Sequence, residues 1–342
     1  MSKQTLQSIV ADLMQEGKGI LAADASATTM NKRLAAVGVE QDEESRRRYR
    51  QLLFTTPGFF EGISGVILYD GTIRQSHDNG TPFVELLTKK GVVPGIKVDQ
   101  GKVDLYRFPG EQVTEGLDGL HGRLVEYYRM GARFAKWRAV IPIGEGLPNE
   151  EVIDANAHYL ARYAGICQEV GVVPMVEPEV LITGDHTIER CADVMRSTLG
   201  ILFHELEKFR IDLSGVILKT SMVLSGKERA FDDPETVADH TVEVLRQMVP
   251  QEVGGVVFLS GGQSPEQATA NLNAIVRRGP HPWPLTFSYS RAVQEPVLDA
   301  WEGLDANATE AQRIFAHRID MNARAQRGEY DPSLEERDAS SH

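Results

Sequence analysis

The sequence has few cysteines, no long apolar run and no excess of basic residues. Its two cysteines, Cys167 and Cys191, are too few for a disulfide framework, so we expect a reducing, cytoplasmic setting. No run of about 18 apolar residues occurs and the N-terminus lacks a signal peptide's apolar core, so no membrane segment is expected. The formal net charge of −13 disfavours nonspecific binding to nucleic acid or anionic membranes. A locally basic pocket could still bind an anionic substrate.

Motifs of several enzyme classes are also missing. No GxGxxG opens a helix after the first strand, which disfavours dinucleotide binding, and no GxSxG or HExxH occurs. Asp185-His186 is interpreted as a loop or helix start, and the two cysteines as core residues on helical segments. We therefore expect neither a metal nor a cofactor.

What the chain does contain is a regular alternation of two patterns. Between longer amphipathic segments such as 151–171 and 187–209, eight short apolar runs rich in β-branched residues predict strands. These runs are 19–24, 62–70, 93–99, 132–140, 172–179, 214–220, 254–262 and 285–290.

The alternation predicts an α/β fold in which helices cover a parallel sheet. Eight strands favour closure into a (β/α)8 TIM barrel, with an open doubly wound sheet as the alternative. An extra helix is predicted at about 2–16. Because no linker interrupts the pattern, we expect residues 1–342 to form a single (β/α)8 barrel domain, with a mobile tail at about 331–342.

Charged and polar residues follow the predicted strands, where a barrel places its active site. They are Asp24, Asp70, Lys97, Asp99, Lys136, Arg138, Glu177, Glu179, Lys219, Ser260 and Arg291. A charge at an inward strand position costs several kcal/mol unless it is paired or hydrated. One such residue would favour a structural ion pair, but several lysines and carboxylates together favour a catalytic site.

Lys219 ends an apolar strand with no carboxylate beside it in the sequence. Burial and repulsion from a nearby cation such as Lys136 predict a lowered pKa, and a neutral amine can form a Schiff base with a ketone or aldehyde. The iminium would then accept electrons during carbon–carbon cleavage or proton removal. Glu177 could shuttle protons and Asp24 could accept a hydroxyl proton, although the sequence leaves the division of these roles open.

Ser260-Gly261-Gly262 follows the seventh predicted strand and precedes a helix. Backbone N–H groups there, with the helix dipole, could bind phosphate, and Arg291 follows the eighth strand. The alternative is a turn that requires glycine for its positive φ. A basic run, Arg46-Arg47-Arg48, is interpreted as a solvated helix face offset by Glu43 and Glu44.

At these residues the sequence resembles class I fructose-1,6-bisphosphate aldolases, the Schiff-base type. The matching stretches include KGILAAD (18–24), GIKVDQG (95–101), FAKWR (134–138), VPMVEPE (173–179), FLSGGQS (258–264) and LTFSYSRA (285–292). The resemblance implies reversible cleavage of fructose 1,6-bisphosphate to dihydroxyacetone phosphate and glyceraldehyde 3-phosphate. It further implies a phosphosugar substrate, no cofactor, no nucleic-acid or membrane partner, and a homotetramer.

The resemblance also implies residue roles. Lys219 matches the Schiff-base lysine, Glu177 the acid/base glutamate and Asp24 the aspartate that helps break the bond between carbons three and four; Lys136 matches the neighbouring lysine. One phosphate site is implied for Ser260, Gly261, Gly262, Ser288 and Arg291. The other end of the substrate is implied to lie near Ser26, Thr29, Lys32, Arg33 and Lys97. Arg138 and Glu179 resemble supporting charges.

The chain departs from the family pattern at three places. The nucleophile segment reads Lys-Thr-Ser-Met (219–222) where Lys-Pro-Asn-Met is familiar, and residues 25–28 read Ala-Ser-Ala-Thr where Glu and Gly are familiar. Animal members of the family end in a tyrosine that assists proton transfer, whereas this chain leaves Tyr330 or His342 as candidates. Two alternatives remain open: a related Schiff-base aldolase preferring another phosphosugar, and a catalytically weak phosphosugar-binding scaffold.

Overall fold

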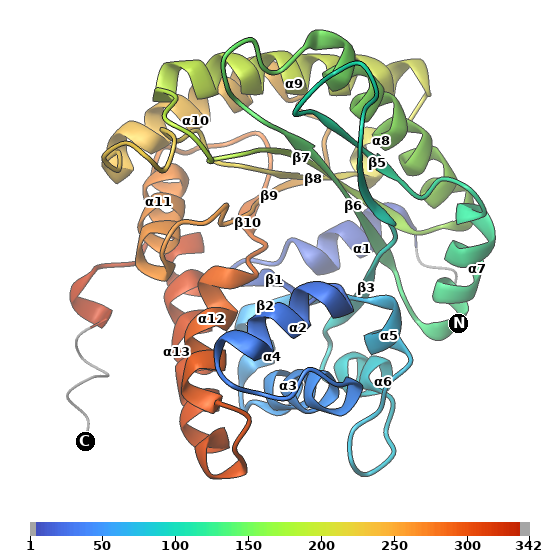
Figure 1. The fold of residues 1–342 in the computed structure, drawn as a ribbon, viewed down its shortest axis with the longest axis vertical. Coiled ribbons are helices and arrows are strands. Elements are labelled where there is room, and N and C mark those ends of the chain that lie inside the picture. Colours follow the sequence, from blue (N-terminus) through green and yellow to red (C-terminus); the bar gives the residue numbers. More distant parts are fainter. Residues whose placement is uncertain (1–4, 336–342) are drawn as a thin grey trace.

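The computed structural model describes residues 5–335, and its centre is a barrel of eight parallel strands (Figure 1). In spatial order these are β1 (Gly19–Ala22), β2 (Ile63–Leu68), β3 (Val93–Lys97), β6 (Phe134–Ile141), β7 (Val173–Val180), β8 (Ile217–Thr220), β9 (Gly255–Phe258) and β10 (Leu285–Phe287). The Ala22 N–H donates to the Tyr289 carbonyl at 3.0 Å, which joins β1 to the segment after β10. The predicted TIM-barrel class and all eight predicted strands are confirmed.

Helices surround this barrel. They are α1 (Leu6–Leu13), α2 (Ala27–Ala36), α3 (Glu43–Thr55), α4 (Phe59–Gly62), α5 (Asp70–Ile73), α6 (Phe83–Lys89), α7 (Leu120–Met130), α8 (Glu150–Val170), α9 (Ile188–Lys208), α10 (Pro234–Met248), α11 (Pro265–Arg277), α12 (Arg291–Trp301) and α13 (Ala308–Gln326). Local sequence sets their starts: the Asp42 carboxylate caps α3, and Asp233 caps α10 with Pro234 in the first turn. The main core lies between the helices and the outer faces of the strands.

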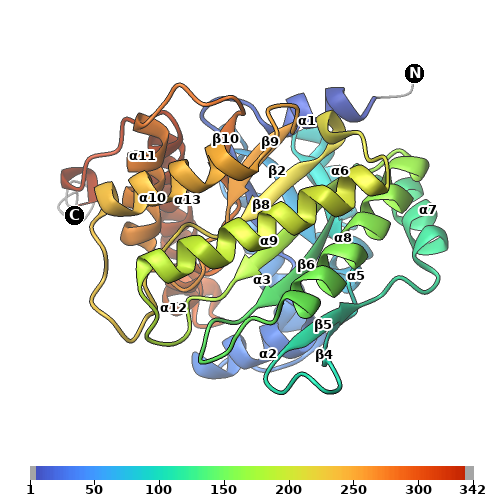
Figure 2. The same cartoon turned by 90° about the horizontal axis from the view of Figure 1, so that it is seen from above.

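Helix α1 closes the N-terminal end of the barrel. Ile9, Val10 and Leu13 pack against apolar residues inside the barrel, including Ile20 and Phe134. Figure 2 shows α1 at one end of the barrel and α2 at the opposite end. Helix α1 is shorter than the predicted 2–16, and residues 2–4 of that prediction lie outside the described range. The site is therefore confined to the C-terminal ends of the strands.

A two-stranded antiparallel hairpin, β4 (Gly101–Asp104) and β5 (Gln112–Glu115), extends from the end of β3 and was not predicted from the sequence. The Thr114 hydroxyl donates to the Arg138 carbonyl at 2.8 Å, which fastens the hairpin to β6. Most of the predicted tail, from residue 336, lies outside the described residues. Within residues 5–335, no helix is both long and apolar enough to cross a membrane.

Candidate active site

An open cleft of about 1330 Å³ lies at the C-terminal end of the barrel. Its lining includes every predicted site residue except Gly262: Asp24, Ser26, Thr29, Lys32, Arg33, Lys97, Lys136, Arg138, Glu177, Glu179, Lys219, Ser260, Gly261, Ser288 and Arg291. These residues come from seven of the eight strands or the segments that follow them. The barrel thus brings together groups that are up to 267 positions apart, counting from Asp24 to Arg291.

The centre of the cleft is a chain of two lysines and two carboxylates. The Lys136 Nζ lies 2.7 Å from Asp24 Oδ2 and 2.9 Å from Glu177 Oε2. The other oxygen of Glu177 lies 3.1 Å from the Lys219 Nζ. All four residues are buried. The carboxylate that Lys219 lacks in its own sequence neighbourhood is therefore supplied by β7, and Glu177 bridges the two ammonium groups.

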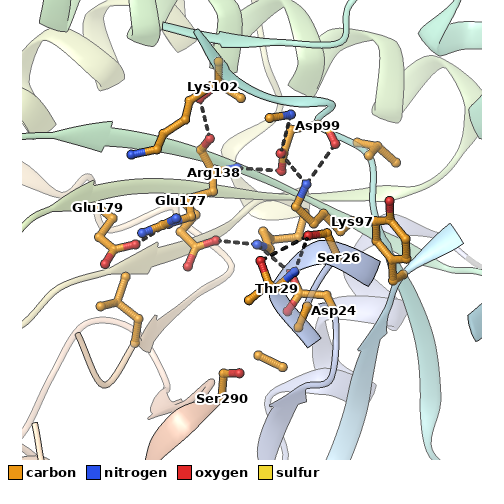
Figure 3. Close-up of a pocket in the computed structure, with 18 of the residues that line it drawn as sticks. Asp24, Ser26, Thr29, Lys97, Asp99, Lys102, Arg138, Glu177, Glu179 and Ser290 are labelled. Carbon is orange, nitrogen blue, oxygen red and sulfur yellow. Dashed lines mark hydrogen bonds and ion pairs between the residues drawn. The ribbon is translucent and has the colours of Figure 1, made fainter. Parts of the chain in front are cut away.

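Strand alternation explains this convergence. Lys136 and Arg138 lie two residues apart on β6, and Glu177 and Glu179 lie two apart on β7, so each pair shares one face of its strand. The register of the two parallel strands places Arg138 beside Glu177. Figure 3 shows Glu177, Glu179 and Asp24 directed into one space.

The ion pairs control the charge states at the centre. Burial alone would raise the pKa values of Asp24 and Glu177, but Lys136 and Lys219 outweigh that effect and hold both pKa values below their usual range. Burial would likewise lower the pKa of Lys136, yet Asp24 and Glu177 raise it above its usual value. At neutral pH both carboxylates are ionised and Lys136 is charged.

A second group of charges lies beside the first. The Lys97 ammonium donates to the Asp99 carboxylate and to its carbonyl oxygen, the latter at 2.9 Å. The Arg138 guanidinium is paired with the Glu179 carboxylate. Burial opposes the charge of Arg138, but Glu179 raises its pKa above the usual value. Each of these cations is thus held in place before any ligand binds.

The loop after β9 and the start of α12 form one lobe of the cleft. Gly261 and Gly262 have φ values of 59° and 98°, so glycine is required there for the backbone conformation. The Arg291 guanidinium lies close behind Gly262, because a Cβ added there would be 3.4 Å from its Nη2. The buried Ser288 hydroxyl has no hydrogen-bond partner within residues 5–335. An arginine, a free hydroxyl and a glycine turn therefore line one concave surface.

A second lobe is built on the N-terminus of α2. The Ser26 hydroxyl accepts a hydrogen bond from the Thr29 N–H at 3.3 Å, and Lys32 and Arg33 follow one turn later. Burial lowers the pKa of Arg33, whose Nη1 donates to the Ser290 hydroxyl at 3.3 Å. Ser290 was not predicted, although its position between two predicted residues, just before α12, was an available signal.

Tyr330, one candidate to replace the family's terminal tyrosine, is not among the residues that line the cleft. Its hydroxyl donates to the Glu335 carboxylate at 3.0 Å. His342, the other candidate, lies outside the described residues. Within 5–335, no group of three His, Cys, Asp or Glu side chains is arranged to hold a metal ion.

Comparison with known proteins gives a consistent result. A family model described as fructose-bisphosphate aldolase class-I matches residues 5–342. The chain is 51% identical, over 96% of its length and 99% of the relative's, to a probable fructose-bisphosphate aldolase class 1 of Xanthomonas campestris. It is 50% identical to the cytosolic fructose-bisphosphate aldolase 6 of Arabidopsis thaliana, over 92% of the chain and 88% of the relative.

A solved structure agrees with these sequences. The fructose-bisphosphate aldolase of Plasmodium falciparum, crystallised with TRAP and a small-molecule inhibitor, superimposes with a TM-score of 0.94 at 46% identity. The match covers 95% of each chain. At this identity the similarity extends beyond the fold to the sequence.

Proposed function

The chain belongs to the class-I fructose-bisphosphate aldolase family, and from this premise we propose how its cleft residues divide the family's reaction. The reaction is the reversible cleavage of fructose 1,6-bisphosphate to dihydroxyacetone phosphate and glyceraldehyde 3-phosphate through a lysine Schiff base. The observation that carries the assignment is the bridge made by Glu177, whose two oxygens face the ammonium groups of Lys136 and Lys219.

Lys219 is the nucleophile. Its Nζ must transfer a proton before it attacks the substrate's C2 carbonyl, and the Glu177 carboxylate at 3.1 Å is the nearest acceptor. Attack gives a carbinolamine, and Glu177 then returns a proton to the departing hydroxyl so that water leaves and the iminium forms. Lys136, charged and fixed between two carboxylates, holds Glu177 in position for both transfers.

Asp24 accepts the proton of the C4 hydroxyl. As that O–H bond breaks, the C4–O carbonyl forms, the bond between carbons three and four breaks, and its electron pair moves into the iminium to give an enamine. The lowered pKa keeps Asp24 ionised, and the 2.7 Å contact with Lys136 orients it. Glyceraldehyde 3-phosphate leaves first, and protonation and hydrolysis of the enamine release dihydroxyacetone phosphate.

Two cationic lobes line the cleft around Lys219, which supports a substrate with two phosphates. The lobe with Ser260, Gly261, Gly262, Ser288 and Arg291 binds the phosphate of the dihydroxyacetone phosphate half. The unpartnered hydroxyl of Ser288 supports this assignment, because a buried polar group without a partner is stabilised by a ligand that supplies one. The lobe with Ser26, Thr29, Lys32, Arg33 and Lys97 binds the other end, while Arg138 and Glu179 support its charges.

Substitution of the nucleophile tests this proposal. Lys219→Met keeps a similar volume but removes the amine, so cleavage should be lost while the phosphosugar still binds through its phosphates. The measurements are steady-state cleavage assays and isothermal titration with fructose 1,6-bisphosphate. Retained turnover would refute the covalent route.

We further propose a cytoplasmic setting and a homotetramer. The names of plant relatives, which describe cytosolic proteins, support the first proposal. Family membership alone supports the second. Sedimentation velocity of the purified chain would measure the oligomeric state.

A further inference from the structure

The arginines of α3 fall into two groups, and the first is neutralised by carboxylates. The Arg47 Nη2 lies 2.6 Å from Glu44 Oε1 and 2.5 Å from Asp78 Oδ1. The Arg48 Nη2 lies 2.6 Å from Asp305 Oδ1. Arg46 and Arg50, four positions apart, lie on one face of the helix and form the second group. Glu44 thus offsets part of the basic run, as the sequence predicts, whereas Glu43 forms no ion pair with it within residues 5–335.

Arg46 and Arg50 form the second group, and neither has an ion pair within residues 5–335. The Arg46 Nη1 donates to the neutral Asn31 side chain at 2.7 Å. The Arg50 Nε donates to the Ala23 carbonyl at 3.0 Å, and its Nη1 faces the Met30 sulfur at 3.4 Å. The Arg50 Nη2 has no hydrogen bond within the described part of the chain. Two guanidinium groups therefore share one face without a bound carboxylate.

Both arginines line a cavity of about 190 Å³ between α3 and the loops after β1 and β2. Thr72 and Gln75 contribute polar side chains to its wall, and Glu43 contributes one carboxylate, which accepts a hydrogen bond from Gln75 at 3.3 Å. The volume is ample for a small ion with bound water. A few residues line both this cavity and the catalytic cleft, but the two spaces are separate. The cavity lies behind the loop that carries Asp24.

Because Arg50 is buried, its lack of an ion pair within the described residues is costly for the fold. Arg50 is only 2% exposed. Burial lowers its pKa to about 10, and the like charges of Arg33 and Arg46 contribute to the shift, while Tyr49 and Asp24 oppose it. A buried cation without a hydrogen-bonded anion is costly for the fold, so a bound anion would be stabilised here.

We propose that this cavity binds a small tetrahedral oxyanion, with inorganic phosphate as its natural form. Arg46 and Arg50 hold it from one face of α3, since planar guanidinium groups offer several donors matched to phosphate oxygens. Glu43 restricts the site to a small ion by repelling additional negative groups. The site is distinct from both phosphate-binding lobes of the cleft and does not depend on the roles proposed for the residues there.

Isothermal titration of the full chain with inorganic phosphate tests the proposal. Saturating fructose 1,6-bisphosphate is kept in both cell and syringe, so that the cleft is already occupied. The wild-type chain should bind one phosphate per subunit. Arg46→Gln should weaken this binding about tenfold or more, because a hydrogen bond to a charged group typically contributes that factor. Arg48→Gln is the matched control, since it removes the same charge from the same helix and should leave the affinity unchanged.

A third variant should change the phosphate affinity in the opposite direction. Glu43→Gln removes the only carboxylate that lines the cavity within the described residues, so phosphate should bind more tightly. The proposal is overturned if no phosphate binds while the cleft is occupied, or if Arg46→Gln and Arg48→Gln have equal effects. It is also overturned if Glu43→Gln weakens binding. The comparison of the two arginine variants holds whatever ligand occupies the cleft.

Discussion

Replacing Lys136 by methionine should destabilise the protein in a pH-dependent way. The ammonium of Lys136 is the only ion-pair partner of Asp24 within residues 5–335, at 2.7 Å, whereas Glu177 keeps Lys219 at 3.1 Å. Lys136→Met therefore leaves one buried carboxylate unpaired. Breaking a buried pair in this way costs about 3–5 kcal/mol at neutral pH.

That cost can be converted into an expected fall in melting temperature. At about 2.1 cal/mol/K per residue, a chain of 342 residues has an unfolding entropy near 0.7 kcal/mol/K, so the melting temperature should fall by roughly 4–7 °C. The assay is a thermal-unfolding scan of both proteins between pH 5 and pH 8, at one protein concentration and one scan rate.

The sign of the pH dependence follows from the two states of Asp24. In the wild type the pKa of Asp24 lies below its usual value of 3.8, so the ionised carboxylate stabilises the fold above that pH. This contribution is lost as pH falls through the folded pKa. In the variant, burial without Lys136 raises the pKa of Asp24 in the folded state. The charged carboxylate then destabilises the fold at higher pH, and protonation of Asp24 removes this destabilisation. The difference between the two proteins should therefore shrink towards pH 5.

A surface arginine provides the matched control. Arg278 also faces two carboxylates, Glu235 at 2.5 Å and Asp239 at 2.6 Å, but both are exposed. Arg278→Met should cost less than about 1 kcal/mol and shift the melting temperature by about 1 °C. Equal shifts in the two variants, or a Lys136→Met deficit that does not change with pH, would refute the reasoning.

The remaining predictions concern catalysis. Asp24→Asn keeps the shape but removes the proton acceptor, so kcat should fall about 10²–10⁴-fold with little change in substrate affinity; steady-state kinetics measures both, and a loss confined to KM would contradict the assigned role. Arg291→Gln removes a phosphate contact while leaving the Schiff-base residues intact. It should raise KM at least about tenfold, and an unchanged KM would exclude Arg291 from the phosphate site.

The barrel could be predicted because each strand is a short, nearly continuous apolar run that is buried on both faces. The hairpin β4–β5 could not, since Gly101–Asp104 and Gln112–Glu115 are short and mixed in polarity, and its contact with β6 joins Thr114 to a residue later in the chain. Helix α1 was predicted as an extra element, but its packing inside the end of the barrel depends on residues far along the chain.

The active site, like the fold, could be predicted only in part from the sequence. Strand ends identified the charged residues, because a parallel barrel brings those ends together. Their pairing was beyond the sequence: Glu177 lies 42 positions from Lys219 and reaches it only through the strand arrangement. Likewise, nothing in the basic run indicates that Arg48 pairs with Asp305 while Arg46 faces a cavity. Such partners are set by tertiary packing, which local patterns do not encode.

The most direct test of the central claim is chemical trapping of the nucleophile. The chain is mixed with dihydroxyacetone phosphate, reduced with borohydride, digested and mapped by peptide mass. We predict a stable adduct on Lys219, because its amine is the one that bonds to the ketone. An adduct on Lys136 or Lys97 instead, or none on any lysine, would contradict the account.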